Sequence, residues 1–446
     1  MLIPRADQEQ CIQKLLAIHA SGFVSLDMSD TGTGKTLVAL ELSRHMQLRP
    51  FVIVPKAGVS QFRTAAELQN IQVAECRNVE ALKTGKYPSL RRATSGELRY
   101  LWQLPKDALF IGDEVHKFGG IDSDNSLLLA MLKAYRVHVH LMSATLASTP
   151  LRLRAVGSLL SWYTYRPDAN FYEWAKRFGC FFNDATARWE FDRTANRIFH
   201  LQRLHEALKP FSVRMRIEDI PGFPETEIYP VLVDLNQRDT EEIRKLYADM
   251  RQAVRELQAV TAETENLRRR QKVELLKAGV LAEMVDDIVD EGRSAVVFVC
   301  FRDTVTALRR LLKERDIESV GIIGGQNPVE REAGRLAFQQ NLVHVCVCTV
   351  GAGGASINLH DEKKERPRSS LICPDWNDVD TKQCLGRIHR FGGSRSIQRF
   401  VLAANTIEES VYKGVMRKVG NMKTINDGHA GVDTMLAEMR DELEKR

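Results

Sequence analysis

Residues 23–36, FVSLDMSDTGTGKT, combine an apolar segment, a glycine-containing loop and the start of a helix. The apolar side chains at the beginning of this stretch are typical of a buried strand. Gly32 and Gly34 allow a tight turn because they carry no Cβ. Lys35 then opens the helical pattern that runs through LVALELSRHM. This strand, loop and helix order favours an α/β fold.

The loop also has the pattern of a phosphate-binding loop. Its successive backbone N–H groups, Thr33 included, and the positive end of the following helix would cradle the β- and γ-phosphates of ATP. Lys35 would neutralise those phosphates, and the Thr36 hydroxyl would hold Mg²⁺. Ser29 stands where the strict pattern has glycine, so the first turn departs from that pattern. A chance glycine-rich turn is the alternative.

Composition limits the possible classes of protein. The chain has 446 residues, enough for two or three domains, and its 44% hydrophobic content is ordinary for soluble globular protein. The net charge of +5 permits nucleic-acid binding without requiring it. The 8 cysteines form no C-x-x-C pair and are expected to be reduced and buried, with a zinc site at Cys346 and Cys348 as the alternative. No apolar run predicts a membrane span, so we expect a cytoplasmic protein.

A second chemical motif ends the segment DALFIGDEVHKF, residues 107–118. Asp113 and Glu114 follow an apolar run and are expected at the carboxyl end of a strand. Asp113 would belong to the Mg²⁺ ligand shell, and Glu114 would orient and deprotonate the water that attacks the γ-phosphate. An acidic pair at a solvated strand end is the alternative.

The segment VHVHLMSATLASTP, residues 137–150, predicts another strand. It ends in Ser143, Ala144 and Thr145, which resemble the helicase motif that links hydrolysis to nucleic-acid movement. His138 and His140 share one face of this strand. We interpret both histidines as packing or surface residues rather than metal ligands.

The segment LQRLHEALKPFSVRMRIEDIPGFPETEIYPVLVDL, residues 201–235, resembles the end of the first lobe in Swi/Snf-type translocases. The order of TGTGKT, DEVH, SAT and this segment matches that family. The resemblance extends to about residue 420 and is strongest to compact phage or viral members. It implies two RecA-like lobes that bind ATP between them. It also implies that Gln8, ahead of the loop, reads adenine, with a solvated helix-start glutamine as the alternative.

A second run of apolar strands follows in residues 295–301, 319–325 and 343–354 and predicts another parallel sheet covered on both faces. Gly353 and Gly354 permit close backbone approach, and Asn358 keeps the family's asparagine position. The resemblance implies that these three residues contact nucleic acid.

The segment QCLGRIHR, residues 383–390, matches the family's arginine-bearing helix. Gln383, Arg387 and Arg390 have helical spacing, so we expect them on one face. The resemblance implies that Gln383 contacts the nucleotide and that both arginines reach toward the γ-phosphate. An unrelated exposed helix with two arginines is the alternative.

We therefore predict an α/β protein with two RecA-like lobes, residues 1–236 and 278–446. Residues 237–277 are highly charged with helical spacing and are expected to form a linker. Its cluster Arg268–Arg270 could grip phosphates, although a solvated helix face is the preferred interpretation.

The expected activity is that of a nucleic-acid-dependent ATPase with ATP and Mg²⁺ as cofactors. We expect a monomer, in the host cytoplasm if a phage encodes it, that moves along or remodels duplex or branched DNA. One alternative is a strand-separating helicase on RNA or single-stranded DNA. A nucleotide-gated scaffold, which would bind nucleic acid without moving, is the second.

Overall fold

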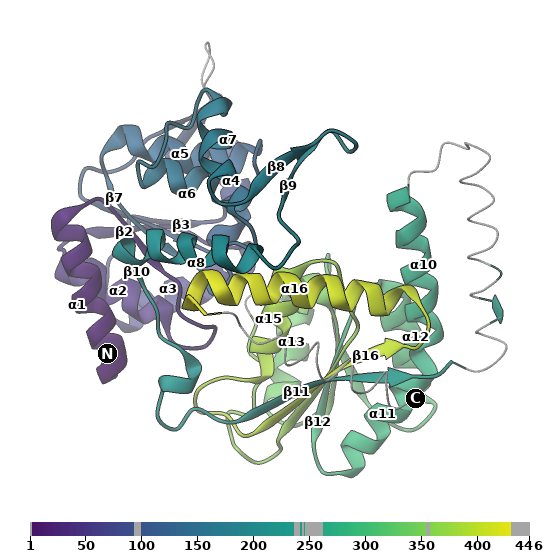
Figure 1. Ribbon diagram of the computed structural model, residues 1–446. Helices are drawn as coiled ribbons and strands as arrows, with labels where there is room; N and C mark the ends of the chain where they lie inside the picture. Colours follow the sequence, from purple (N-terminus) through teal and green to yellow (C-terminus); the bar gives the residue numbers. More distant parts are fainter. Residues whose placement is uncertain are drawn as a thin grey trace. The chain divides into compact units, whose positions relative to one another are not determined.

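The computed structural model describes residues 2–92, 100–235, 241–242, 245, 262–353 and 357–429 (Figure 1). The chain divides into two compact units. The first contains the residues up to Pro221 and the segment that begins at Lys418, and the second contains Gly222–Arg417. We expected the first lobe to continue to residue 236. The chain leaves it earlier because β11, Thr226–Val233, pairs along its whole length with β16 of the second unit.

The first unit is built on a six-stranded sheet of order β10-β1-β7-β6-β2-β3, in which all neighbours are parallel. Its strands are β1 Val24–Asp27, β2 Arg49–Ile53, β3 Glu75–Arg77, β6 Ala108–Asp113, β7 His138–Met142 and β10 Ser212–Val213. The helices of this unit are α1 Ala6–Ser21, α2 Lys35–His45, α3 Val59–Leu68, α4 Val79–Lys83, α5 Asp124–Tyr135, α6 Arg154–Leu159, α7 Asp168–Lys176 and α8 Arg197–Leu208. Two small antiparallel pairs add β4 Leu90–Arg92 with β5 Tyr100–Trp102, and β8 Cys180–Asn183 with β9 Arg188–Phe191.

Strand β6 explains why this sheet is buried on both faces. Phe110 belongs to one apolar cluster, whereas its neighbours Leu109 and Ile111 belong to another. Consecutive side chains of a strand point to opposite faces, so the near-continuous apolar run fills two cores. The parallel arrangement brings the carboxyl ends of β1 and β6, Asp27 and Asp113, to the same edge of the sheet. Ligands of open α/β sheets bind at this edge.

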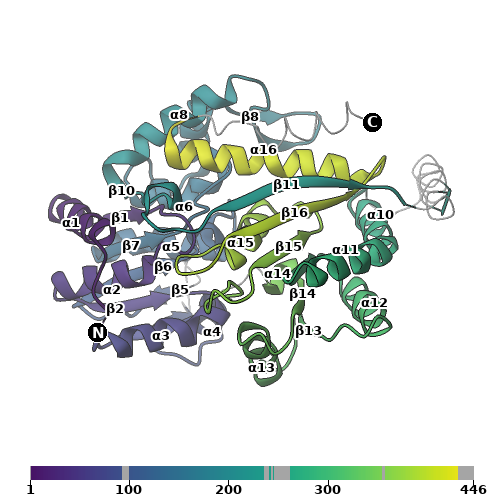
Figure 2. The ribbon, with the colours of Figure 1, turned by 90° about the horizontal axis from the view of Figure 1, so that it is seen from below.

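The second unit has its own six-stranded sheet of order β11-β16-β15-β12-β14-β13, again with parallel neighbours (Figure 2). The strands after β11 are β12 Ser294–Val299, β13 Ser319–Ile322, β14 Val345–Thr349, β15 Arg368–Ile372 and β16 Ser396–Ala403. The helices are α10 Ala262–Leu276, α11 Ala278–Asp290, α12 Arg302–Lys313, α13 Pro328–Gln339, α14 Val350–Gly353, α15 Asp378–Ile388 and α16 Ile407–Asp427.

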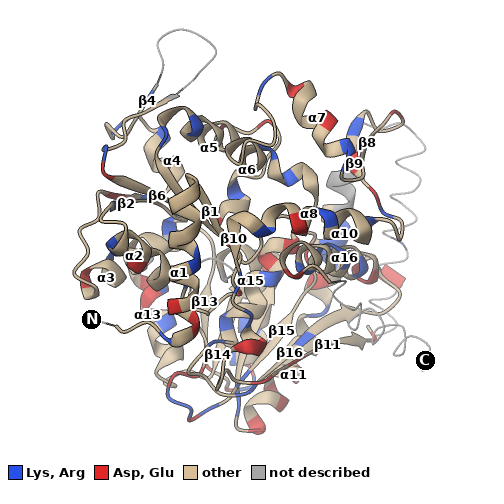
Figure 3. Cartoon of the chain, turned by 60° about the vertical axis from the view of Figure 1, so that its left-hand side comes forward, with Lys and Arg blue, Asp and Glu red and all other residues tan. Residues whose placement is uncertain are grey.

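The described part of the expected linker is a helix of the second unit, α10, whose basic residues are blue in Figure 3. Most of residues 237–261 lies outside the described residues. Arg268 is exposed, as a solvated face predicts, but Arg270 is 8% exposed and bonds to Asp375 at 2.7 Å. The interpretation of the cluster as solvated was therefore wrong for Arg270. Successive helical residues face different directions, so one arginine of the cluster points into the unit.

Helix α16 is shared by the two units. Its start follows Thr406, whose hydroxyl accepts a hydrogen bond from the Glu408 N–H at 3.2 Å, as a helix cap does. Tyr412 packs on Phe400 of the second unit, whereas Ile425 belongs to the apolar core of the first. We expected the whole C-terminal region in the second lobe, but the described residues from Lys418 to His429 belong to the first unit.

Candidate functional site

The loop between β1 and α2 has the backbone of a phosphate cradle. Gly32 and Gly34 have left-handed φ angles of 83° and 94°, which favour glycine. A Cβ on Gly34 would lie 2.3 Å from Gln8 Nε2, so a side chain there would displace the Gln8 amide. Helix α2 begins at Lys35, directly after the loop. The N–H groups of its first turn therefore face the loop, as anion binding requires.

Lys35 bonds to the loop that carries it. Its Nζ donates to the carbonyl oxygens of Ser29 and Asp30, each at 2.9 Å. Thr33 Oγ1 donates to the same Asp30 carbonyl at 2.9 Å, and Thr36 is half-buried in the first turn of α2. The ammonium group thus lies within the loop. Its hydrogen bonds could pass from these carbonyl oxygens to the oxygens of a bound phosphate.

Gln8 is part of the same cradle. It is 2% exposed, and its Nε2 donates to the Thr33 carbonyl at 2.9 Å. Its Oε1 accepts from the Arg5 N–H at 2.9 Å, and the Arg5 guanidinium also donates to the Thr33 carbonyl at 3.0 Å. The alternative of a solvated glutamine was therefore wrong. Arg5, which the sequence pattern did not single out, helps to fix the loop.

Asp113 and Glu114 lie at the end of β6 in an environment that favours a cation. Burial, reinforced by the Glu114 charge, raises the pKa of Asp113 to about 7, although Lys35 opposes the shift. Glu114 has a φ of 52°, which is uncommon for a residue with a Cβ and typical of functional positions. Two crowded carboxyl groups beside a phosphate cradle fit the ligand chemistry of nucleotide-bound Mg²⁺.

His116 joins the acidic pair to the SAT motif. Its Nδ1 lies 3.3 Å from Glu114 Oε2, 3.0 Å from Thr145 Oγ1 and 3.3 Å from Ser143 Oγ. The Ala144 carbonyl of the same motif accepts a hydrogen bond from Asn426 Nδ2 of α16 at 3.0 Å. Sequence analysis assigned no role to His116, although its place two residues after Glu114 is a signal that could have identified it.

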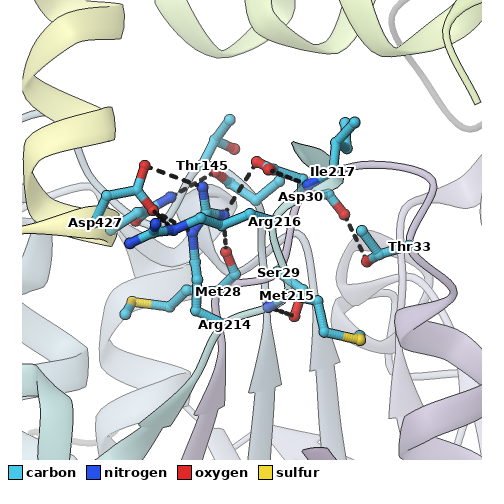
Figure 4. A network of polar contacts seen from close by, with 12 residues as sticks. Met28, Ser29, Asp30, Thr33, Thr145, Arg214, Met215, Arg216, Ile217 and Asp427 are labelled. Carbon is cyan, nitrogen blue, oxygen red and sulfur yellow. Dashed lines mark hydrogen bonds and ion pairs between the residues drawn. The ribbon is translucent and has the colours of Figure 1, made fainter. Parts of the chain in front are cut away.

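A network of polar contacts connects the loop to the segment after β10 (Figure 4). The Asp30 N–H donates to the Met215 carbonyl at 3.0 Å, and the Met215 N–H donates to Ser29 Oγ at 2.9 Å. Ser29, where the strict pattern has glycine, thus has a partner of its own. Arg214 lies 3.1 Å from Asp30 and 2.7 Å from Asp427 of α16. Sequence reasoning did not identify Arg214 or Asp427 as site residues.

The candidate residues of the second unit are arranged differently from the prediction. Gln383 and Arg387 are 4% and 3% exposed in α15, and Arg387 Nη1 donates to the Ile357 carbonyl at 3.3 Å. The helix ends at Ile388, so Arg390 does not continue its face. The reason is the extended backbone of His389, whose Nε2 lies 2.7 Å from the Pro224 carbonyl. Arg390 is half-buried, with its Nε donating to the Gly386 carbonyl at 3.0 Å.

The predicted nucleic-acid contacts of the second unit are only partly described. Gly353 is the last residue of α14, and Asn358 is half-buried in the segment that follows. Gly354 lies outside the described residues. The sulfur atoms of Cys346 and Cys348 are buried 3.5 Å apart. Within the described ranges, no cluster of three or more histidine, cysteine or acidic side chains is suited to hold a metal ion.

Comparison with known proteins shows similarity to ATP-dependent helicases. A comparison with family models found no match. The chain is 26% identical to protein L364 of Acanthamoeba polyphaga mimivirus, named as an ATP-dependent RNA helicase, over 94% of this chain and 83% of the viral protein. It is 28% identical to the human DNA excision repair protein ERCC-6-like over 30% of this chain and 11% of that protein. These relatives fit a Swi/Snf-type helicase of superfamily 2 with nucleic-acid-dependent ATPase activity.

The fold of this helicase matches a solved structure as well. Saccharomyces cerevisiae Dbp5, bound to RNA and ADP BeF3, aligns with a TM-score of 0.53 and 14% identity, over 94% of this chain and 88% of Dbp5. This likeness establishes two RecA-like lobes. In the part of the helicase that the structure describes, no helix is long and apolar enough to cross a membrane.

Proposed function

We propose that this helicase hydrolyses ATP to move along duplex or branched DNA, acting as a cytoplasmic monomer. The observation that carries the proposal is the contact between the phosphate loop and the segment that resembles Swi/Snf-type translocases. In that segment Arg214 pairs with Asp30 at 3.1 Å, and Met215 accepts a hydrogen bond from the Asp30 N–H and donates one to Ser29 Oγ. The segment by which the sequence resembles duplex translocases is therefore attached to the ATP-binding element.

In this proposal, each residue at the sheet edge has a separate role in ATP hydrolysis. Bound MgATP would supply the γ-phosphoryl group and the charge of the metal. Lys35 would transfer its hydrogen bonds from the loop carbonyls to phosphate oxygens, and Thr36 and Asp113 would hold the metal shell. Glu114 would orient the attacking water and accept its proton.

The remaining candidate residues supply charge and coupling. Gln8 would contact the adenine, and Gln383 the nucleotide. We assign Arg390 and Arg387 to stabilisation of charge on the γ-phosphate, and Arg390 is the more accessible of the two. His116 would transmit the state of Glu114 to the SAT motif, which we propose to couple hydrolysis to nucleic-acid movement together with Gly353, Gly354 and Asn358.

An RNA helicase is the second candidate, because the viral relative L364 carries that name and aligns over 94% of this chain. The human relative is named a DNA excision repair protein. ATPase rates with duplex DNA, forked DNA, single-stranded DNA and RNA separate the two candidates. The proposal expects the largest stimulation with duplex or forked DNA. Binding should weaken steeply with salt, because contacts in such a groove go mainly to phosphates.

Movement is tested by displacement of a third strand from a DNA triplex, which requires translocation but no separation of the duplex. Weak triplex displacement together with efficient unwinding of tailed duplexes or RNA would replace the proposal with the RNA or single-strand alternative. Nucleotide binding without any turnover, with or without DNA, would instead favour the nucleotide-gated scaffold.

A further inference from the structure

The C-terminal end of α16 contacts both nucleotide-linked motifs of the first unit. Asp427 pairs with Arg214 through Oδ1 at 2.7 Å and Oδ2 at 3.3 Å, a two-point contact between carboxylate and guanidinium. The preceding residue, Asn426, donates to the Ala144 carbonyl of the SAT motif at 3.0 Å. Asn421, about one and a half turns earlier, donates to the Ser148 carbonyl at 3.3 Å.

Arg214 extends this contact to the phosphate loop. The same guanidinium donates to the Met28 carbonyl and lies 3.1 Å from Asp30 Oδ1. Asp30 is the residue whose carbonyl accepts hydrogen bonds from Lys35 Nζ and Thr33 Oγ1, each at 2.9 Å. One arginine therefore joins the last residue of α16 to the part of the loop that holds the catalytic lysine.

The pairing is protected from solvent, which makes it stronger than a surface ion pair. The side chains of Asp427 and Arg214 are 3% and 14% exposed, and the Asp30 side chain is 20% exposed. Arg216 adds a second positive charge 3.4 Å from Asp427. Removal of Asp427 leaves Arg214 with Asp30 alone, and removal of Arg214 leaves Asp427 with Arg216 alone, so the charge balance beside the loop depends on the whole set.

We propose that Arg214 and Asp427 are positioning residues that hold the phosphate loop in its binding conformation. This inference rests on the proposed ATP site. It adds that the loop is fixed by the end of a helix whose first part, Ile407–Arg417, belongs to the second unit. The ion pair acts on loop order and not on the reacting atoms.

Two substitutions test the positioning role. Asp427→Asn keeps the shape of the side chain and removes its charge, and Arg214→Gln removes the partner. Each should raise the KM for ATP and the Kd of a fluorescent ADP analogue about tenfold, the equivalent of one charged hydrogen bond. The kcat at saturating ATP should stay within about twofold, because the catalytic groups are untouched.

The double variant and two controls complete the test. Asp427→Asn combined with Arg214→Gln should bind the ADP analogue no more weakly than the weaker-binding single variant, because both substitutions break the same ion pair. Asp427→Glu keeps the charge and should restore most of the affinity. Glu409→Gln alters an acid at the other end of α16, which accepts from the Asn405 N–H at 2.7 Å, and should leave the Kd unchanged.

Two outcomes would overturn the inference. The first is an ADP-analogue Kd in Asp427→Asn equal to that in Glu409→Gln. The second is a fall in kcat that parallels a loss of folded protein in thermal melts, with KM unchanged, because this pattern indicates a purely structural role. Neither of these measurements requires DNA. A parent protein that binds nucleotide but is not stimulated by DNA would refute the proposed translocation and leave the comparison of Kd values valid.

Discussion

Acid should destabilise the first unit by protonating a row of hydrogen-bonded histidines that joins α1 to the strands β1 and β7. Ser25 Oγ lies 2.8 Å from both His19 Nε2 and His140 Nδ1, and His19 Nδ1 lies 3.0 Å from His138 Nδ1. With every ring neutral, all three contacts are satisfied when the donors run in one direction from ring to ring, and either direction does so. An additional proton would place a positive charge on a buried ring, because His19 and His140 are 6% and 0% exposed. These histidines therefore accept protons readily only after the protein unfolds.

The magnitude follows from the pKa values. Burial lowers the pKa of His140 from 6.5 to about 3, and burial together with the neighbouring His140 and His138 lowers that of His19 to about 3. Between pH 6.5 and about pH 3 the unfolded protein binds more protons than the folded protein. The contribution of the two neutral histidines to the free energy of unfolding is therefore fully present above pH 6.5 and is lost as the pH falls toward 3. At about pH 5 each histidine costs about 2 kcal/mol, or about 4 kcal/mol for both.

The assay compares urea unfolding of the parent and of His140→Leu at about pH 7.5 and about pH 5. Trp102, Trp162, Trp174 and Trp189 lie in the first unit, so tryptophan fluorescence reports mainly on its unfolding. The loss of stability between the two pH values should be about 2 kcal/mol smaller in His140→Leu, because one titrating group is gone.

The matched control is Val139→Ala on the same strand, a buried residue that does not titrate. It should lower stability at both pH values without changing the difference between them. An equal pH dependence in the parent and in His140→Leu would refute the assignment of the acid sensitivity to this chain.

The other predictions concern single side chains. Lys35→Ala should abolish ATP turnover, whereas Glu114→Gln should bind ATP without cleaving it, and a parental rate in either variant contradicts the assigned role. Arg390→Ala should lower kcat by about 10³-fold with a smaller loss of ATP affinity in steady-state assays, and an unchanged rate with saturating DNA excludes it from the site. Lys277→Met should destabilise the second unit by about 3–5 kcal/mol in urea unfolding, because it leaves Glu408, its buried partner at 2.8 Å, uncompensated. Addition of Glu408→Gln should recover much of that loss, and an additive effect of the two substitutions would argue against the pair.

The elements that the sequence predicted well are those in which local pattern and tertiary structure require the same residues. Strand β6 needs apolar side chains on both faces, and its run ALFIG provides them. The phosphate loop needs glycine at two left-handed positions, and Gly32 and Gly34 occupy them. These requirements fall within a few consecutive residues, so one sequence suffices to recognise them.

The features that the sequence did not predict depend on contacts between distant residues. Arg214 and Asp427 are separated by 213 positions, and neither belongs to a local motif that indicates the other. Arg390 has perfect helical spacing from Arg387, yet the helix ends first because His389 bonds to Pro224, 165 residues away. Local spacing cannot reveal an ending imposed by a tertiary contact.

The early boundary at Pro221 and the return of α16 to the first unit have one physical consequence for the ATP site. The loop contains the half-buried charges of Asp30 and Lys35, and a charge that is partly removed from water requires partners. Carbonyl groups within the loop satisfy Lys35, but Asp30 receives its guanidinium from Arg214, just before the boundary. Arg214 also pairs with Asp427 at the end of α16, and Arg216 lies 3.4 Å from the same carboxylate and 3.8 Å from Glu218. Among the described residues, the carboxylate that pairs with Arg214 beside Asp30 therefore belongs to a helix whose first part lies in the second unit.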